Sequence, residues 1–450
     1  MTDANAIDQF GQQLQGKLVR PGDAEYDEAR RVWNGMIDKR PAMIARCAGT
    51  GDVVAAVNFA RENGLVIAVR GGGHNVAGHA TCDDGVVIDL SPMKNVTVDA
   101  SRKTALAECG ATWRDYDAAT QKHGLASPGG AISTTGIAGL TLGGGFGWIS
   151  RSYGLACDNV ISAEVVTANG EVLEASAEEN ADLFWAIRGG GGNFGVVTRF
   201  EYRLQKIGEL YAGMLLYPRE MAGEFMRVWA DWTAGAPDAV SSMAAFLHTP
   251  DGIPVVGAFI VYNGPADEGE TVIAPLRAVG APALDDVNLK PYTALQQALD
   301  DGFPRGMRNY WKATYLADVG EECRDVLIEH ANNAPTPVSV VGLEHMLGGA
   351  VARVDKNENA FAARDAIYNL LILGRTDNAA GDDAVRDWVR GLWKAVDPYS
   401  TGGAYVNYMS ADEADRVGEA FGASHARLVQ IKSKYDPENF FRLNQNIAPV

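Results

Sequence analysis

Hydrophobic residues recur with helical or strand periods over most of the chain. Within residues 52–63 they fall at i, i+1, i+4 and i+7, which predicts a helix that ends at Gly64. A helix is also predicted over 112–123, with Gly124 as its stop. Alternating or short apolar runs predict strands over 65–69, 85–90, 96–99, 160–168, 172–175 and 196–204. Asn169-Gly170, between two of these strands, is typical of a hairpin turn.

The pattern changes near residues 205–210, where glycine becomes sparser. Beyond this point, strands at 255–262 and 338–346 alternate with helices at 219–233 and 383–396. This arrangement predicts a second α+β domain over about 211–400. The stretches 401–410 and 435–447 are again rich in Tyr, Asn or Gly, as the first part of the chain is.

Composition excludes several classes of protein. The 450 residues are 47% hydrophobic with a formal net charge of −18, and they contain no Lys/Arg cluster for nucleic acid. No signal-peptide pattern and no run of 18 apolar residues occur, so we expect a cytoplasmic location without a membrane partner. Five cysteines without C-x-x-C, and histidines without metal spacing, favour reduced thiols and no metal site.

The first candidate for chemistry is the turn after the strand at 65–69. Gly71, Gly72 and Gly73 allow close backbone approach to a ligand, and successive N–H groups in such a turn can bind a pyrophosphate. His74 follows at once, where its ring could meet a cofactor. From the residues alone, a glycine turn with an incidental histidine remains an equal alternative.

Two further glycine-rich stretches stand out. Residues 189–195 (GGGGNFG) match G-x-G-x-x-G, but a strand follows instead of a helix, so we predict a tight turn beside a cofactor and no Rossmann site. Residues 128–147 hold eight glycines with hydroxyl side chains between them. An extended backbone of this kind suits a long anionic molecule, and its interspersed apolar residues argue against a flexible linker.

Polar side chains in the second half of the chain supply possible bases. In a strand, Tyr405 and Asn407 would face one side and Tyr408 the other. A tyrosine could remove a proton or orient a substrate, although an aromatic core strand is the commoner explanation of such a pattern. Glu344 and His345 would face opposite sides of a strand, and one of them could line a pocket. Lys312 has the same ambiguity.

Taken together, these segments resemble the FAD-linked oxidases of the vanillyl-alcohol oxidase and p-cresol methylhydroxylase type. The similar subgroup contains berberine bridge enzyme, bacterial sugar oxidases and 6-hydroxy-D-nicotine oxidase. The motifs that carry the resemblance are RGGGHNVAGH at 70–79, the glycine segment with YGLACDN at 153–159, LFWAIRGGGGNFGVVT at 183–198, YVNYMS at 405–410 and KYDPENFFRLNQNI at 434–447. Their order and spacing extend over nearly the whole chain.

The resemblance implies an α+β fold with three parts. Residues 1–205 would form a PCMH-type FAD-binding domain of two α+β subdomains. Residues 206–400 would form a substrate-binding domain, a large antiparallel sheet covered by helices on one face. Residues 401–450 would be a berberine-bridge-type segment that returns to the FAD domain.

The resemblance also implies FAD linked through an 8α-histidyl bond to His74. Many relatives add a cysteinyl bond, but that position is Ile132 here, and we read Cys157 as a packed small side chain. We therefore expect no second link. The expected cofactor-binding residues are Arg70, Gly71, Gly72, Gly73, His74, Asn75, Gly78, His79, Pro128, Gly129, Ser133, Thr134, Gly136, Gly139, Gly143, Gly144, Gly147, Asn159, Val197, Asn407, Asn444 and Gln445.

The implied reaction is hydride transfer from a small alcohol, sugar hydroxyl or amine to flavin N5, with O₂ as acceptor and H₂O₂ as product. The expected catalytic residues are Tyr405 and Tyr408 for an alcohol and Glu344 for an amine. One alternative is a flavin dehydrogenase that uses a quinone or a carrier protein. Another is a non-catalytic flavin-binding protein. The expected partners are the substrate and O₂, and a homodimer is an open alternative.

Overall fold

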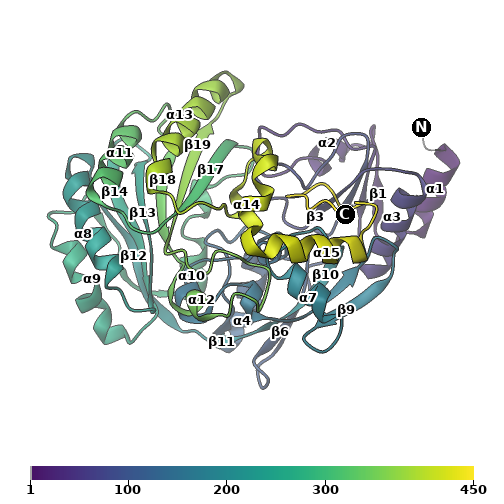
Figure 1. Ribbon diagram of the computed structural model, residues 1–450, viewed down its shortest axis with the longest axis horizontal. Helices are drawn as coiled ribbons and strands as arrows, with labels where there is room; N and C mark the ends of the chain where they lie inside the picture. The colour runs from purple at the N-terminus through teal and green to yellow at the C-terminus, as the bar shows by residue number, and fades with distance from the viewer. Residues whose placement is uncertain (1–2) are drawn as a thin grey trace.

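The chain folds into two halves joined by its C-terminal segment. The computed structural model describes residues 3–450. Strands β1–β10 occupy one half and the large sheet of β12–β19 the other, and α15 (His425–Tyr435) returns across the first half (Figure 1). We call the half formed by residues up to 206, with 401–450, the first domain, and residues 209–400 the second domain.

The first subdomain of the first domain is a four-stranded sheet with the order β1-β2-β4-β3. Its central pairs, β2 with β4 and β4 with β3, are parallel, and helix α3 is the crossover that returns the chain to this sheet. The predicted helix and strands are confirmed here. The bounds are α1 (Ala4–Gln13), β1 (Lys17–Val19), α2 (Tyr26–Ala29), β2 (Met43–Arg46), α3 (Thr50–Glu62), β3 (Ile67–Arg70) and β4 (Val86–Asp89).

The second subdomain is a five-stranded antiparallel sheet with the order β5-β6-β10-β8-β9. Helix α4 begins with a capping box between Thr112 and Asp115, and the short 3₁₀ turn that follows it ends at Gly124 with φ +65°. The bounds are β5 (Val96–Asp99), β6 (Thr104–Glu108), α4 (Trp113–Thr120), β7 (Leu125–Ala126), α5 (Ile137–Leu142), α6 (Ser150–Tyr153), β8 (Val160–Val166), β9 (Val172–Ser176), α7 (Ala181–Ile187), β10 (Val196–Arg203) and β11 (Gln205–Lys206).

The second domain is built on an eight-stranded antiparallel sheet with the order β15-β12-β14-β13-β18-β19-β17, in which β16 also pairs with β12. Its strands are β12 (Glu209–Pro218), β13 (Val240–His248), β14 (Pro254–Tyr262), β15 (Leu284–Asp285), β16 (Asn288–Pro291), β17 (Arg308–Leu316), β18 (Val340–His345) and β19 (Tyr368–Thr376). Its helices are α8 (Ala222–Ala234), α9 (Gly269–Arg277), α10 (Tyr292–Gln297), α11 (Glu321–Asn332), α12 (Gly349–Arg353) and α13 (Asp382–Ala395).

Both faces of this sheet are covered, which explains why its strands are almost continuously apolar. Helices α8, α9, α11 and α13 lie outside one face (Figure 1), and Leu370 and Ile372 of β19 join their core. The neighbouring Leu371 and Leu373 point to the other face, toward the first domain, because successive strand residues alternate.

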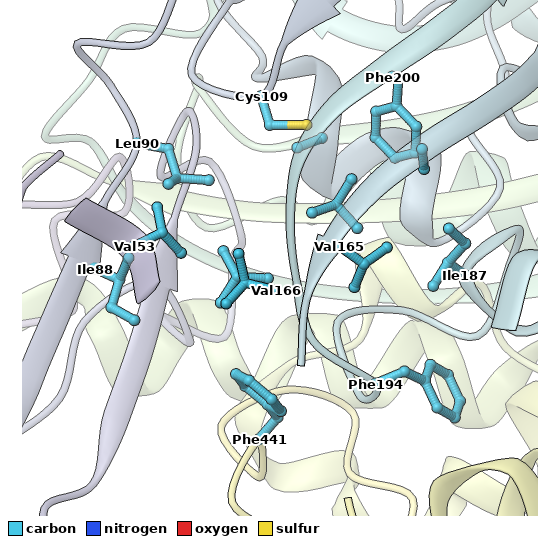
Figure 2. Close-up of a cluster of buried hydrophobic side chains, with 14 of the residues drawn as sticks. Val53, Ile88, Leu90, Cys109, Val165, Val166, Ile187, Phe194, Phe200 and Phe441 are labelled. Carbon is cyan, nitrogen blue, oxygen red and sulfur yellow. The ribbon is translucent and has the colours of Figure 1, made fainter. Parts of the chain in front are cut away.

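The C-terminal segment completes the core of the first domain. Figure 2 shows Phe441 in the same apolar cluster as Val166 and Phe194. Buried residues of α14 (Val417–Phe421) and α15 belong to this cluster too. The later part of the segment therefore packs into the first domain, while Thr401 and Ser410 bond to β17 of the second.

Two local predictions are wrong. The 128–147 segment is not extended throughout, because residues 137–142 form α5. Residues 405–408 are not a strand. They contact β17 without forming a ladder with it, and the Tyr408 N–H donates to the Tyr405 carbonyl (2.9 Å), which closes the 3₁₀ helix η8 (Val406–Tyr408).

Candidate active site

A cavity of about 960 Å³ lies between the glycine-rich segments and the inner face of the large sheet. This volume is near the upper end of the roughly 300–1,000 Å³ that is usual for ligand pockets. Its walls come from the turn 71–73, from parts of 130–142 and 191–197, from β13, β18 and β19, and from the C-terminal segment. Segments far apart in sequence therefore meet around one space.

His74 enters this cavity from the turn that follows β3. Arg70, the last residue of β3, forms an ion pair with Asp89 (2.8 Å), which holds the start of the turn in place. The His74 ring stacks on Trp33 at 4.2 Å, and its Nε2 has no hydrogen-bond partner in the described chain. Burial lowers the pKa of His74 to about 4, so the imidazole is neutral at physiological pH.

The glycines of the turn allow two backbones to touch. A Cβ on Gly72 would lie 2.4 Å from the backbone nitrogen of Gly136, and a Cβ on Gly136 equally close to that of Gly72. The turn and the 128–147 segment therefore pack back to back. By contrast, Gly139 and Gly192 line the cavity with open space where a side chain would project. A ligand can approach the backbone at those two positions.

Glu344 reaches the cavity from β18. Its Oε1 accepts a hydrogen bond from the Tyr408 hydroxyl (3.0 Å), and its Oε2 accepts one from Asn369 Nδ2 (2.7 Å). Burial raises the pKa of Glu344 to about 7. The carboxyl can therefore exchange a proton near neutral pH, which is a property of general bases.

Tyr405 lies beside this pair, but its hydroxyl accepts hydrogen bonds where that of Tyr408 donates one. Its hydroxyl oxygen accepts from the Gly145 N–H (3.1 Å) and from Asn407 Nδ2 (2.9 Å), which leaves its own proton available to a ligand in the cavity. Asn407 packs against Gly143, where a Cβ would meet its side chain at 2.3 Å. Burial raises the pKa values of both Tyr405 and Tyr408, so both phenols are protonated.

The expected catalytic residues therefore come together, although they lie on different elements. The strand assumption placed Tyr405 and Tyr408 on opposite sides, but the 3₁₀ turn brings both to the cavity with ring centroids 4.9 Å apart. Glu344 and His345 do face opposite sides, as predicted: Glu344 lines the cavity, and His345 is buried beside Tyr368 on the helix side.

The expected cofactor-binding residues divide into two groups. Those that line the cavity are Gly71, Gly72, Gly73, His74, Asn75, His79, Gly136, Gly139, Val197, Asn407, Asn444 and Gln445. Those that lie outside its lining are Arg70, Gly78, Pro128, Gly129, Ser133, Thr134, Gly143, Gly144, Gly147 and Asn159.

Residues of the second group bond to protein atoms. Ser133 donates from both N–H and Oγ to Asp300 of the second domain (2.9 and 2.6 Å), and Arg114 shares that carboxylate. Asn159 donates to the carbonyls of Tyr153 and Leu155. These side chains hold the wall in place and do not form its surface.

Matches to known proteins extend along the whole chain. An FAD-binding domain is matched over residues 41–176, and a berberine and berberine-like domain over 404–448. An FAD-linked oxidoreductase of Dictyostelium discoideum is 32% identical over 446 residues, which is 99% of this chain and 97% of that protein. The chain belongs to the berberine-like family of FAD-linked oxidoreductases.

Relatives with named activities support the same assignment. The (R)-6-hydroxynicotine oxidase of Paenarthrobacter nicotinovorans is 31% identical to this FAD-linked oxidoreductase, with 97% of each chain covered. The crystal structure of 6-hydroxy-D-nicotine oxidase from Arthrobacter nicotinovorans has a TM-score of 0.88 at 30% identity, and covers 97% of this chain and 98% of that one. The α+β fold and the oxidoreductase class predicted from the sequence are confirmed.

The cavity of the oxidoreductase suits FAD. A flavin needs apolar walls for its ring system and closely approachable backbone for its diphosphate. The lining supplies both, with Leu140, Leu142 and Val197 beside the bare backbone at Gly139 and Gly192. The Nε2 of His74 is a buried polar atom without a hydrogen-bond partner among residues 3–450.

Sequence reasoning missed several polar residues of the site, among them Asn369 and Arg375, and left Lys312 ambiguous. Asn369 holds Glu344, and Arg375 lines the cavity farther along the same strand. No motif marks either residue, since their facing depends on the strand register. Trp311 lines the cavity, whereas Lys312 points away and lies 3.4 Å from Glu413.

Proposed function

We propose that this protein is an oxidase that removes a hydride from a carbon bearing an amine or hydroxyl group of a small molecule and passes the electrons to O₂, giving H₂O₂. The observation that carries the proposal is the Glu344–Tyr408 pair. Of the residues 3–450 that line the cavity, Glu344 alone is acidic, and it is held by two hydrogen bonds.

The pair can accept the proton that the substrate gives up, from the hydroxyl of an alcohol or from the ammonium form of an amine. From an alcohol the proton passes through Tyr408, which already donates to Glu344, as the C–H bond is oxidised. From an amine the Glu344 carboxylate takes the proton of the ammonium form, and hydride loss from the resulting neutral amine leaves an iminium cation beside the carboxyl. Asn369 fixes the carboxyl, and the free proton of Tyr405 orients the substrate heteroatom. The apolar surroundings exclude water, which keeps the proton affinity of Glu344 high.

FAD, when bound, supplies the hydride acceptor. We propose a single covalent link through His74, which is supported by its neutral ring and its place in the cavity. No cysteine among residues 3–450 lines the cavity, and the side chain at the position of the second link in doubly linked relatives is Ile132. Two linkages are therefore not expected.

The proposal is tested first by a substrate screen with anaerobic flavin reduction as the readout. Amines, primary and secondary alcohols and sugars are compared, because one relative is named as an oxidase of 6-hydroxynicotine, an amine. In air, one H₂O₂ is expected per substrate oxidised. Rapid reduction without H₂O₂ would instead indicate a dehydrogenase, and a flavin that none of these compounds reduces would contradict catalysis.

The role of Glu344 has its own test. In the wild type, the rate of flavin reduction should rise with pH and level off above about 7, because only ionised Glu344 accepts the proton. Glu344→Gln should lower the rate by about 10²–10⁴-fold and flatten this profile. His345→Gln, on the other face of the same strand, is the matched control and should retain the profile.

A further inference from the structure

Arg375 is the second charged residue in the cavity. Of the described residues that line it, only Glu344 and Arg375 belong to the charged types Asp, Glu, Lys and Arg. Arg375 is 7% exposed, and burial lowers the pKa of its guanidinium to about 10, so it is a cation at neutral pH. A buried cation without a counter-charge is unfavourable, so its partners matter.

In each of the other buried arginines, both Nη1 and Nη2 donate to protein atoms. Arg70, Arg188 and Arg364 each form an ion pair with a carboxylate. Arg151 and Arg219 have no carboxylate within 4.0 Å in the described chain, but each uses Nε, Nη1 and Nη2 in hydrogen bonds to protein oxygens.

Arg375 differs from all of these. Its Nε donates to the Val338 carbonyl (2.7 Å) and its Nη1 to the Gly302 carbonyl (2.7 Å). Its Nη2 has no acceptor among residues 3–450, and no carboxylate forms an ion pair with it there. The outer Nη1–Nη2 edge of a guanidinium is the fork that binds a carboxylate with two hydrogen bonds.

The position of Arg375 relative to Glu344 follows from β19. Asn369 bonds Glu344, and Leu371, Leu373 and Arg375 follow on the same face. Six residues of strand separate Asn369 and Arg375 by about 20 Å between α-carbons, and the long side chain of Arg375 shortens the gap that a ligand must bridge. The surface between the two charged ends is apolar.

Contacts also place Arg375 near the His74 side of the cavity. Its guanidinium lies 5.0 Å from the centre of the Phe303 ring. The Phe303 carbonyl accepts from Trp33 Nε1 (3.1 Å), and Trp33 stacks on His74. The spacing along β19 keeps Arg375 remote from the proton-accepting pair.

We propose that the substrate carries a carboxylate that binds the free fork of Arg375, joined by an apolar body to the amine or alcohol carbon that is oxidised beside Glu344. Only the identity of the oxidised group in this inference rests on the proposed function. The carboxylate site itself follows from the unpaired cation in an apolar cavity.

The experiment measures binding, so it does not depend on turnover. Phenylacetate, phenylbutyrate and phenylhexanoate are titrated into the FAD-loaded protein beside their carboxamides, and the change in flavin absorbance gives each Kd. In the wild type, the longer acids should bind at least about 10-fold more tightly than their amides. Arg375→Gln should remove this difference and leave the amide Kd unchanged, and Arg375→Lys should restore part of it.

Arg219→Gln is the matched control, since Arg219 is also buried without an ion pair but does not line the cavity. It should lower stability and keep the preference for acids. Equal Kd values for acids and amides in the wild type, or a preference that survives Arg375→Gln, would overturn the inference. If acids bind through Arg375 but no compound reduces the flavin, the carboxylate site stands and the oxidase proposal fails.

Discussion

His74 and His79 both line the cavity within the same loop, so the covalent link can be assigned by a matched pair of variants. His74→Ala should leave FAD bound without a covalent bond. Acid precipitation should then give a colourless pellet and a yellow supernatant, whereas the wild type and His79→Ala should give yellow pellets. A yellow His74→Ala pellet would show that another residue holds the flavin.

At the scale of single residues, a functional side chain could be predicted from its immediate sequence neighbours, but not where its position depends on which face of a strand it occupies. His74 could be predicted because it directly follows three glycines. Glu344 could be suspected because a polar residue stands out in an apolar strand. Arg375 could not, since nothing in its neighbours shows that β19 turns it toward the cavity while its Nη2 stays unpaired.

At the scale of elements, α4 of the first domain meets α10 of the second through one buried contact. Gln296 Nε2 donates to Asp117 Oδ2 (3.0 Å) and to the carbonyl of Gly130, which lines the cavity. Asp117 Oδ1 and Gln296 Oε1 have no partner among the described residues. A protonated Asp117 can donate to an unpaired oxygen of this kind, whereas an ionised one cannot.

This contact should make stability depend on pH. Burial raises the pKa of Asp117 to about 7, above the value near 4 expected in the unfolded chain. The folded state therefore holds a proton that the unfolded state releases, and stability should fall as pH rises from about 4 to about 7. Asp117→Asn keeps a neutral hydrogen-bonding group and should raise stability at pH 8 by on the order of 2 kcal/mol.

Melting temperatures of the wild type and Asp117→Asn at pH 5 and pH 8 measure this effect. The advantage of the variant should be larger at pH 8. Asp387→Asn, on the exposed face of α13, should show no such difference. If Asp117→Asn were equally destabilising at pH 5 and pH 8, the Asp117 carboxyl would be ionised at both pH values, which would contradict the prediction.

Elements were predictable where periodicity is long and unbroken, as in α3 and β10. They were not predictable where tertiary packing determines the local backbone conformation. Residues 405–408 alternate like a strand, but they close a 3₁₀ turn in which Tyr405 and Asn407 bond to the backbone of residues 140–145. That difference matters for the site, because it brings Tyr405 and Tyr408 to one cavity.

At the scale of the whole molecule, the cavity exists only because three parts of the chain assemble around it. The second domain is fastened to the first partly by Asp300, which accepts from Ser133 and Arg114. The C-terminal segment supplies Tyr405 and Tyr408 and then packs into the core of the first domain. The family resemblance implied this return, and the reappearance of glycine, asparagine and tyrosine after residue 400 agrees with it, but neither showed the contacts that secure it.

The C-terminal segment is secured by a fully buried ion pair. Lys432 Nζ lies 2.6 Å from Asp436 Oδ2 and also donates to the carbonyls of Asn193 (2.8 Å) and Phe441 (3.0 Å). It thus joins α15 both to the turn 189–195 beside the cavity and to the last residues of the chain. Removing one member of such a pair leaves the other charge buried and unpaired.

Lys432→Met should therefore lower the free energy of unfolding by about 3–5 kcal/mol and expose residues 436–450 to limited proteolysis. Lys434→Met is the matched control, because Lys434 pairs with Asp182 at the surface and its loss should cost less than about 1 kcal/mol. Thermal melting and protease mapping of both variants measure the effect.

The loss of order should also weaken FAD retention in Lys432→Met combined with His74→Ala, because Asn444 and Gln445 line the cavity. Equal stability of the two lysine variants would show that the segment is held by apolar packing alone.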